Sequence, residues 1–526
     1  MDLQNANDEI KEEDNFLTED DTLNPKYERG DTSFMGGFIQ IGNTILGAGI
    51  ISLPVVIRYL GFILGILFII IIAILTVYSC YLLLKAHQIT RKKKYSTIAH
   101  AAMGGKGYIF TNIMIILNNF GLSCVYFRIV GDTIQNIVGG YVSKDSFLVT
   151  NWHNFLYILI ILIIMCFIIW TEDFKKFEKT SFLGMVGIIV YCVTILILFV
   201  YKLIEGFKPF YSKDSYFIDE EFTNTLISLP SVFLSFSFQF NLFPIYSGLR
   251  ERTHHEMLNV TEATIIFCLI LYLVTGIIGF LMYGNSLNDT ILLAFLADMQ
   301  NKETTQFMKI LLIIINIGFL ACSSTSIPLV YYTLKQNFFS TYKYIVKKRG
   351  KSGKNIEMEK EENNPQNSIN NFNPPNEGED ADNSSVEENS ENNENNENKE
   401  NKKEDANNDN DVVRMDSMAS ADNTMDDAAK RIKVNVSKKE EIIISIILYI
   451  TVGVVTILVP ELKSLFNIVG CTAANAIQFI IPSLMIVCLG KKAEKLVNLF
   501  FAKILLIFGI VSLILSLTAE IIHVFL

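Results

Sequence analysis

Residues 37–54 read GFIQIGNTILGAGIISLP, and this apolar segment with four glycines and a closing proline decides the fold. It is a poor helix, because glycine loses conformational freedom on ordering and proline lacks an amide donor. Backbone interrupted at membrane depth is tolerated where it is buried in protein or lines a cavity. The glycines alone are compatible with close helix packing, but the embedded Asn43 favours an unwound binding segment.

The remainder of the chain has the composition of a protein that crosses a membrane many times. Of its 526 residues, 50% are hydrophobic and 19% are charged, against about 25% charged in soluble chains. A hydrocarbon core needs about 20 apolar residues per helix. Eleven segments approach or meet this length: 36–60, 61–86, 108–138, 155–171, 182–203, 222–246, 263–283, 307–334, 441–459, 465–489 and 496–524. The sequence predicts an all-α membrane protein with about eleven transmembrane helices, with a tight turn at Gly61 between the first two.

The distribution of basic residues predicts the orientation. Lysines and arginines concentrate in alternate loops, which mark the cytoplasmic side, and these loops contain residues 91–94, 175–179, 250–252, 343–349 and 491–495. The N-terminus is therefore expected in the cytoplasm and the C-terminus on the opposite side. A plasma membrane and a vacuolar or lysosomal membrane fit equally. The eight cysteines are scattered through apolar segments, without the spacing of a metal site.

Two segments have the composition of disordered chain. Residues 351–438 are rich in asparagine and glutamate, and 22 acidic and five basic residues lie between Glu357 and Asp427. Such composition buries too little apolar surface to offset the entropy of ordering. We expect a disordered cytoplasmic insert here and a disordered acidic tail over residues 1–35. The transmembrane helices then divide into eight over residues 36–350 and three over residues 439–526.

A second interrupted helix and a hydroxyl cluster accompany the first segment. Residues 230–249 read PSVFLSFSFQFNLFPIYSGL, with two prolines and a polar middle, and residues 321–328 read ACSSTSIP. Spans one and six open the two halves of a five-plus-five arrangement, and because five is odd the second half is inverted. Interrupted helices at matching positions of inverted halves indicate a transporter binding site. Interhelical hydrogen bonding and capping of a kink are the simpler roles for these polar residues.

Charged side chains are sparse inside the predicted membrane region. Arg128 and Asp132 stand at i and i+4 on one helix face, where they can neutralise each other or act as a proton-linked pair. Charged and titratable residues near span ends are expected to reach the interface by snorkelling; they are Lys85, His87, Glu205, Glu520 and His523. Spans one, six and eight have no acid in their cores, which favours a neutral amino acid over a cationic one.

Several motifs together resemble a known family. GNTILGAGIISLP, FSFQFNLFPIYSGL, YFRIVGD and NIVGCTAANAIQFIIPSLMIV are similar to segments of the first, sixth, third and tenth helices of the amino acid/auxin permease family. This family includes sodium-coupled neutral amino acid transporters and vacuolar amino acid transporters. The resemblance implies an inverted-repeat fold of the APC/LeuT-like kind plus one extra helix.

The resemblance also implies a site between spans one and six. The expected substrate-binding residues are Asn43, Gly47, Ala48, Gly49, Phe238, Gln239 and Asn241. A sodium site is implied at Asn43 with Ser323 and Ser326. Two departures from the family pattern affect these assignments. The segment around Gln239 replaces a His-Pro stretch, which concerns the choice of substrate, and Arg128 stands where an apolar residue is usual, which concerns the coupling ion.

These features predict a secondary active transporter that moves amino acids, coupled to Na⁺ or H⁺ by alternating access. The alternative is a transporter-like amino acid sensor that signals through its tail or insert. The sequence has no HExxH motif, paired intramembrane carboxylates or nucleophile–base arrangement that would indicate an enzyme. We expect an amino acid substrate and a lipid bilayer as partners, with no nucleic acid and no cofactor, and the oligomeric state is left open.

Overall fold

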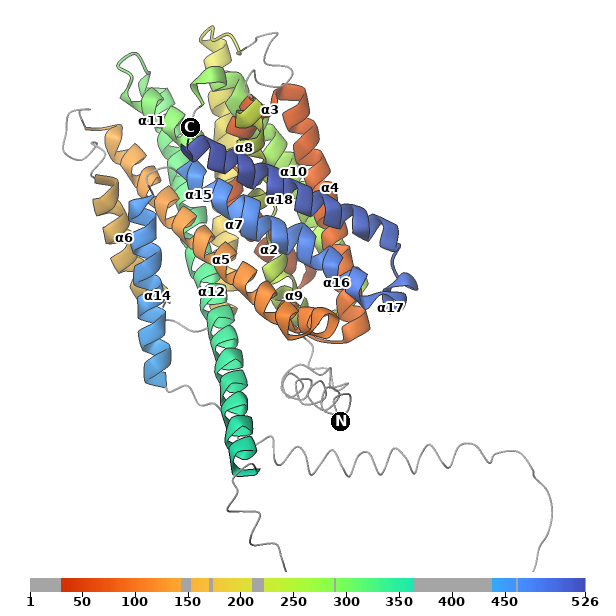
Figure 1. Ribbon diagram of the computed structural model, residues 1–526. Coiled ribbons are helices and arrows are strands. Elements are labelled where there is room, and N and C mark those ends of the chain that lie inside the picture. The colour runs from red at the N-terminus through yellow and green to blue at the C-terminus, as the bar shows by residue number, and fades with distance from the viewer. Residues whose placement is uncertain are drawn as a thin grey trace, which may run out of the picture. The chain divides into compact units, whose positions relative to one another are not determined.

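The computed structural model describes residues 30–142, 153–169, 174–210, 222–287, 290–362, 438–459 and 462–525. Within these ranges the chain is helical, apart from turns and one isolated backbone bridge. Contacts divide the chain into two units, Met1–Thr341 with Ser437–Leu526, and Tyr342–Val436. The first unit holds the helix bundle (Figure 1).

The helices follow one another in a simple order. They are α2 (Phe34–Gly49), α3 (Leu53–Leu60), α4 (Phe62–Thr90), α5 (Tyr95–Gly139), α6 (His153–Ile169), α7 (Phe174–Ile204), α8 (Phe222–Ser235), α9 (Gln239–Gly248), α10 (His254–Tyr283), η2 (Gly284–Ser286), α11 (Ile291–Gln300), α12 (Gln306–Glu362), α14 (Lys438–Leu458), α15 (Leu462–Val469), η3 (Gly470–Ala474), η4 (Ala476–Ile480), α16 (Ile481–Leu489), α17 (Lys491–Glu494) and α18 (Leu499–Phe525).

The predicted all-helical membrane fold is confirmed. Nine helical spans in the described chain are long and apolar enough to cross a membrane. The two other expected spans are the first, which is divided into α2 and α3, and the fourth, α6, which has 17 residues. The count of eleven therefore stays a prediction.

The outer surface of the bundle is apolar, as lipid requires. On α14 the side chains of Ile447, Ile450 and Val454 are exposed, and on α18 those of Ile507 and Ile514 are exposed. A water-soluble protein rarely exposes contiguous apolar surface of this extent. These helices therefore have the surface expected at the periphery of a membrane bundle.

Glycine and proline explain several helix boundaries. Gly61 has a φ of 83° between α3 and α4, which confirms the predicted tight turn. Pro54 lies in the first turn of α3, where its missing amide is not needed by the helix. Gly104 has a φ of 70° inside α5 and marks a kink. The third predicted span began at residue 108, so the short helix before this kink was missed.

The tenth span changes its winding at the centre of the bundle. The consecutive segments η3 and η4 are π-helical and flank Asn475. Wider helical turns of this kind occur frequently at functional sites. Side chains of neighbouring helices bond two carbonyls here, since the Tyr95 hydroxyl donates to the oxygen of Ile477 at 2.6 Å and Ser79 donates to that of Gln478.

The predicted disordered segments lie mostly outside the described residues. Helix α12 continues to Glu362, past the predicted start of the insert at residue 351, and residues 363–437 are not described. The description of the N-terminal region begins at Gly30, and α2 begins at Phe34. The assignments of the insert and the tail remain predictions.

Candidate functional site

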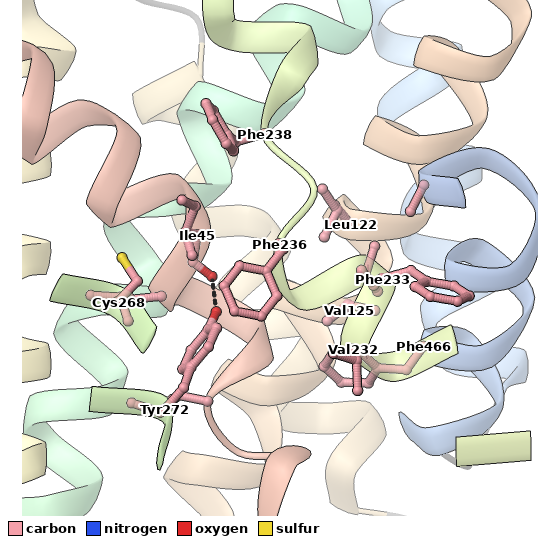
Figure 2. Close-up of a cluster of buried hydrophobic side chains, with 14 of the residues drawn as sticks. Ile45, Leu122, Val125, Val232, Phe233, Phe236, Phe238, Cys268, Tyr272 and Phe466 are labelled. Atoms are coloured by element: carbon pink, nitrogen blue, oxygen red, sulfur yellow. Dashed lines mark hydrogen bonds between the residues drawn. The ribbon is translucent and has the colours of Figure 1, made fainter. Parts of the chain in front are cut away.

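The first and sixth spans are both interrupted, and their interruptions meet. Residues Ile50–Ser52 form a turn between α2 and α3, and residues Phe236–Phe238 separate α8 from α9. Helix α2 packs against α8 and α9, and α3 packs against α8. Figure 2 shows Phe236 beside Ile45 of α2 and Tyr272, with Phe238 further along the sixth span. The break begins directly after Gly49, whereas Asn43, which was predicted in an unwound segment, lies inside helix α2.

Tyr272 of α10 connects the two interrupted spans. Its hydroxyl lies 2.6 Å from the carbonyl oxygen of Ile45 in α2 and 2.9 Å from that of Ser235 in α8. The side chain is fully buried, and the dashed line in Figure 2 marks the bond to Ile45. The sequence analysis missed this residue, because an isolated tyrosine in an apolar helix carries no signal of its partners.

 Two glycines at this crossing, Gly47 and Gly49, leave no room for a side chain. Both were predicted as substrate-binding residues, and both lie where α2 comes closest to its neighbouring helices. A Cβ on Gly47 would lie 2.2 Å from the Tyr126 hydroxyl, and one on Gly49 would lie 2.5 Å from the Ser235 hydroxyl. Real Cβ atoms do not come this close to other atoms. Any side chain at either position must therefore displace the helices that meet here.

Asn43 lies at the meeting point of three helices. It is fully buried in α2, and its Oδ1 accepts a hydrogen bond from the Cys322 thiol of α12 at 3.8 Å. A Cβ on Gly184 of α7 would lie 2.2 Å from Asn43 Oδ1 and 2.4 Å from the Thr325 hydroxyl. The amide oxygen and this hydroxyl therefore converge on one spot. Asn43 Nδ2 has no hydrogen-bond partner within the described ranges.

Three hydroxyls of α12 donate to carbonyls of the same helix. Ser323 donates to the carbonyl of Phe319 at 2.9 Å, and Ser326 donates to that of Cys322 at 3.0 Å. Both are buried. Thr325, which was not among the predicted ion-site residues, also donates to the Cys322 carbonyl, at 2.9 Å, and it is the hydroxyl placed next to Asn43 through Gly184. Which member of ACSSTSIP faces the first span depends on the rotation of α12, and the sequence does not carry that information.

The predicted residues of the sixth span lie at the end of its break and in the first turn of α9. Phe238 and Gln239 are fully buried, and the Phe238 amide donates to Gln239 Oε1 at 3.0 Å. Gln239 Nε2 has no partner among the described atoms. Asn241 connects three spans instead, since its Nδ2 donates to the Thr44 hydroxyl at 3.5 Å and its Oδ1 accepts from the Thr333 hydroxyl at 3.4 Å.

Arg128 and Asp132 form the ion pair that their spacing suggested. The guanidinium Nε lies 3.2 Å from Asp132 Oδ1, and the two side chains are 13% and 18% exposed. The pair lies on α5, on the helix that also carries Tyr126 at the first break. Its opposite charges compensate each other on one helix face, as expected for the structural role. The proton-linked role stays a prediction.

Two of the titratable residues assigned to snorkelling are buried. Glu520 of α18 is 8% exposed and His87 of α4 is 3% exposed. The prediction was wrong for both, because distance from a span end does not tell which face of the helix a residue occupies. Glu205 and Lys85 lie in exposed hydrogen bonds, as expected. The His523 side chain lies outside the described residues.

Backbone hydrogen bonds cover the breaks from both ends of the bundle. At one end the amide of Ile291, the first residue of α11, donates to the carbonyl of Ile51 in the first break at 3.3 Å. At the other end Thr32 donates to Gly248 at 3.0 Å and accepts from the Arg250 amide at 2.9 Å. We call these contacts the α11 cap and the Thr32 strap. The breaks are thus enclosed between a cap on one side and a strap on the other.

Comparison with known proteins agrees with this architecture. Residues 30–526 match the family described as "Transmembrane amino acid transporter protein". A solved structure with a TM-score of 0.54 and 11% identity, covering 94% of this chain and 100% of the other, is MhsT in complex with L-phenylalanine. At this identity the likeness concerns the fold, which confirms the predicted LeuT-like arrangement.

Relatives of known type have low sequence identity to this chain. "Amino acid transporter AVT6E" from Arabidopsis thaliana is 26% identical over 305 residues, which are 57% of this chain and 62% of the relative. "Sodium-coupled neutral amino acid symporter 2" from Danio rerio is 23% identical over 354 residues, 62% of this chain and 67% of the relative. The match to AVT6E spans less than two thirds of that relative's length. These relatives are transporters and not enzymes, and this chain belongs to the family of transmembrane amino acid transporters.

Proposed function

We propose that this protein is a secondary active transporter that moves neutral amino acids across a membrane, driven by a cation gradient. The observation that carries the proposal is the meeting of two helix breaks inside the bundle, with Tyr272 bonded to both spans. Interrupted helices at corresponding positions of two repeats form the binding sites of transporters of this architecture. The printed names of the relatives agree with this substrate class.

The ends of the half-helices suit the two charges of an amino acid. Helices α3 and α9 begin at the breaks, so the positive ends of their dipoles face a bound carboxylate. Helices α2 and α8 end there, and their last carbonyls suit an ammonium group. Ser235 and Gln239 are uncharged side chains at the breaks, which favours a substrate without a charged side chain.

The oxygens next to Asn43 suit a small cation. Asn43 Oδ1 and the Thr325 hydroxyl converge beside the backbone of Gly184, and both are hard oxygen ligands of the kind that bind Na⁺ in transporters. Ser323 and Ser326 lie on the same helix, bonded to its carbonyls. We propose Asn43 and Thr325 as the centre of the Na⁺ site, with the two serines as supports.

In alternating access, the α11 cap and the Thr32 strap would open in turn, one on each side of the bundle. Opening toward the side of α11 requires that the bond between Ile291 and Ile51 break. Opening toward the side of Thr32, which the basic loops predict to be cytoplasmic, requires that the bonds to Gly248 and Arg250 break. A carrier that opens one of these at a time moves its substrate without forming a channel.

Uptake into reconstituted vesicles tests this function. The purified full chain is reconstituted, and uptake of labelled neutral, acidic and basic amino acids is measured under an imposed Na⁺ gradient, an imposed H⁺ gradient or neither. We expect gradient-driven accumulation of neutral amino acids and exchange of internal for external substrate. Protein-free vesicles are the control. Failure of every amino acid to exchange, with correctly inserted protein, would contradict the proposal.

A further inference from the structure

A buried carboxyl group lies apart from the substrate and sodium positions. Glu520 is in α18, the last span, and it is 8% exposed within the bundle. A charge inside a membrane protein costs free energy, and acids at such positions mark ion or proton pathways. The Arg128–Asp132 pair lies on one helix, whereas Glu520 takes part in a series of hydrogen bonds that crosses three spans.

This chain of hydrogen bonds leads from Glu520 to the sixth span. Asn467 of α15 donates from Nδ2 to Glu520 Oε2 at 3.3 Å. The Ser231 hydroxyl of α8 donates to Asn467 Oδ1 at 3.2 Å. All three side chains are buried. We call this set the Glu520 chain; it joins the eleventh, tenth and sixth spans.

The Glu520 chain reaches the break through α8. The Ser235 hydroxyl donates to the Ser231 carbonyl at 2.6 Å, and Ser235 is the residue that a Cβ on Gly49 would meet. A cavity of about 10 Å³ borders the chain and the first break, close to the volume needed for one water molecule. It is lined by Ser52, Val55, Val56, Ser228, Ser231, Lys463 and Phe466.

Other titratable groups near α18 are few. The elements that pack against α18 are α8, α15, α16, η3 and η4. In the described chain, their titratable side chains are Lys463, Cys471 and Cys488. Cys471 interacts electrostatically with Glu520, and the Lys463 ammonium lies over the Tyr59 ring at 4.4 Å. Cys488 is exposed near the other end of its span.

The direction of its hydrogen bonds makes the Glu520 chain sensitive to protonation of Glu520. An ionised carboxylate only accepts hydrogen bonds, while a protonated carboxyl also donates one. At present every donor in the chain points toward Glu520. A proton placed on Glu520 Oε2 turns this atom into a donor toward Asn467, which favours the amide orientation that presents Asn467 Oδ1 to the acid. In that orientation the bond from Ser231 is lost or reversed.

Backbone contact allows such a change to move a half-helix. A Cβ on Gly470 of η3 would lie 2.1 Å from the Pro230 carbonyl oxygen, so the tenth span touches α8 directly. Pro230 is the residue before Ser231. Closely packed segments transmit displacements because interiors have few voids. A rearrangement at Asn467 is therefore felt at the end of α8 that meets the first break.

We propose that Glu520 is a proton-binding site, and that its protonation shifts the equilibrium between the closed and open positions of α8 through Asn467 and Ser231. The inference rests on the proposed transport function and adds a proton site separate from Asn43. The proton enters from the side at which α18 ends, which the basic loops predict to be opposite to the cytoplasm, and it leaves with the inward step of the cycle.

Vesicles with a trapped pH-sensitive dye test this site. Wild type, Glu520→Gln and the control Glu205→Gln are compared for substrate exchange and for internal acidification when a transported neutral amino acid is added. We expect wild type and Glu205→Gln, which changes an exposed acid, to acidify the lumen. Glu520→Gln should keep exchange within about threefold but lose at least about tenfold of the acidification. Its uptake should lose the pH dependence that the wild type shows.

Several outcomes decide the matter. Acidification by Glu520→Gln at the wild-type rate overturns the proposal, and so does wild-type exchange without any acidification or pH dependence. If Glu520→Gln does not insert, Asn467→Ser is used, because it keeps the acid and removes the bond to Ser231. An unchanged pH midpoint of its uptake then contradicts the proposed link through Asn467 and Ser231. Absence of wild-type exchange would instead contradict the transport function itself.

Discussion

At the scale of single residues, the crossing of the first and sixth spans leaves no room around Gly49. A Cβ there would lie 2.5 Å from the side chain of Ser235 and 2.6 Å from the Tyr272 hydroxyl. Both neighbours are buried, and Tyr272 is held by two hydrogen bonds. The neighbours therefore cannot move aside without disturbing both breaks.

We expect Gly49→Val to abolish transport and to leave membrane insertion intact. Valine is at least as lipophilic as glycine, but its methyl groups occupy the space between the two breaks. Gly49→Ala should lower uptake at least about tenfold, which corresponds to ~1.4 kcal/mol. Gly37→Ala is the control, because its nearest atoms are flexible side chains at 3.2 Å. Normal uptake by both Gly49 variants would mean that the glycine serves packing alone.

The sodium position makes a second prediction. Asn43→Ala and Thr325→Ala should each raise the Na⁺ concentration for half-maximal uptake several-fold, because each removes an oxygen from the same spot. The effects should be non-additive in the double variant, as for residues that share one site. Ser324→Ala, on the same helix, is the control. Ser326→Ala should act in the same direction as Thr325→Ala but more weakly, because Thr325 and not Ser326 is the hydroxyl that lies beside Asn43 at Gly184. Wild-type uptake that does not depend on Na⁺ would contradict the assignment of a Na⁺ site to this position.

The sequence was informative at this scale where a residue type is itself unusual for its place. Glycines and an asparagine in an apolar span were visible as such, and the structure brings Asn43, Gly47 and Gly49 to the crossing. Thr325 and Glu520 could not be placed in the same way. Their roles depend on which face of a helix meets its neighbours, and tertiary packing decides that.

At the scale of elements, the important units are half-helices and not whole spans. Helices α2, α3, α8 and α9 are short, between 8 and 16 residues. Short helices are marginal by themselves and take their stability from packing. Tyr272 of the long helix α10 joins two of these half-helices by hydrogen bonds. The breaks were predictable from glycine, proline and polar residues, but the helix that ties them was not.

Tyr272→Phe tests this tie. The variant keeps the ring and removes the hydroxyl, so the carbonyls of Ile45 and Ser235 lose a buried donor, at a cost of about 1–3 kcal/mol. We expect a lower melting temperature of the purified protein in detergent and a lower uptake rate. Tyr201→Phe is the control, because that hydroxyl is in exposed hydrogen bonds with Glu205 and Thr305. Equal melting temperatures for wild type and Tyr272→Phe would show that the tie contributes nothing measurable.

At the scale of the whole molecule, the chain separates into the bundle unit and the unit Tyr342–Val436. The second unit contains many asparagines and acidic residues, a composition that predicts too little apolar surface for a core of its own. The order of the apolar helices followed from apolar segment lengths, because the hydrocarbon core fixes how long a span must be. The helix α12 beyond residue 350 did not follow, because charged sequence does not reveal where a helix stops.

Two measurements test the role and position of this second unit. We expect a chain lacking residues 363–437 to insert and to transport at a rate within about twofold of the full chain, because the bundle contains the core and the site. A deletion of equal length inside the bundle should abolish insertion, because it removes several of the packed helices. Loss of folding on deletion of the insert would contradict the assignment.

The orientation is tested separately with sealed, right-side-out cells. Protease added outside should not cleave within residues 363–437, because the basic loops predict that the insert faces the cytoplasm. Permeabilised cells are the control, in which the same protease should cut there readily. Cleavage from outside in intact cells would invert the topology and with it the sides assigned to the cap and the strap.

The Thr32 strap has a consequence for how this protein can change over evolutionary time. Its bonds run from backbone to backbone, between Thr32 and the residues Gly248 and Arg250. Most amino acids can supply an amide and a carbonyl, so mutations at position 32 can accumulate without breaking the closure. Residues that approach by their main chain are instead constrained in size, as at Gly30, where a Cβ would lie 2.1 Å from the Gly248 carbonyl oxygen. The Thr32 strap can thus persist in lineages whose N-terminal tails share no recognisable motif.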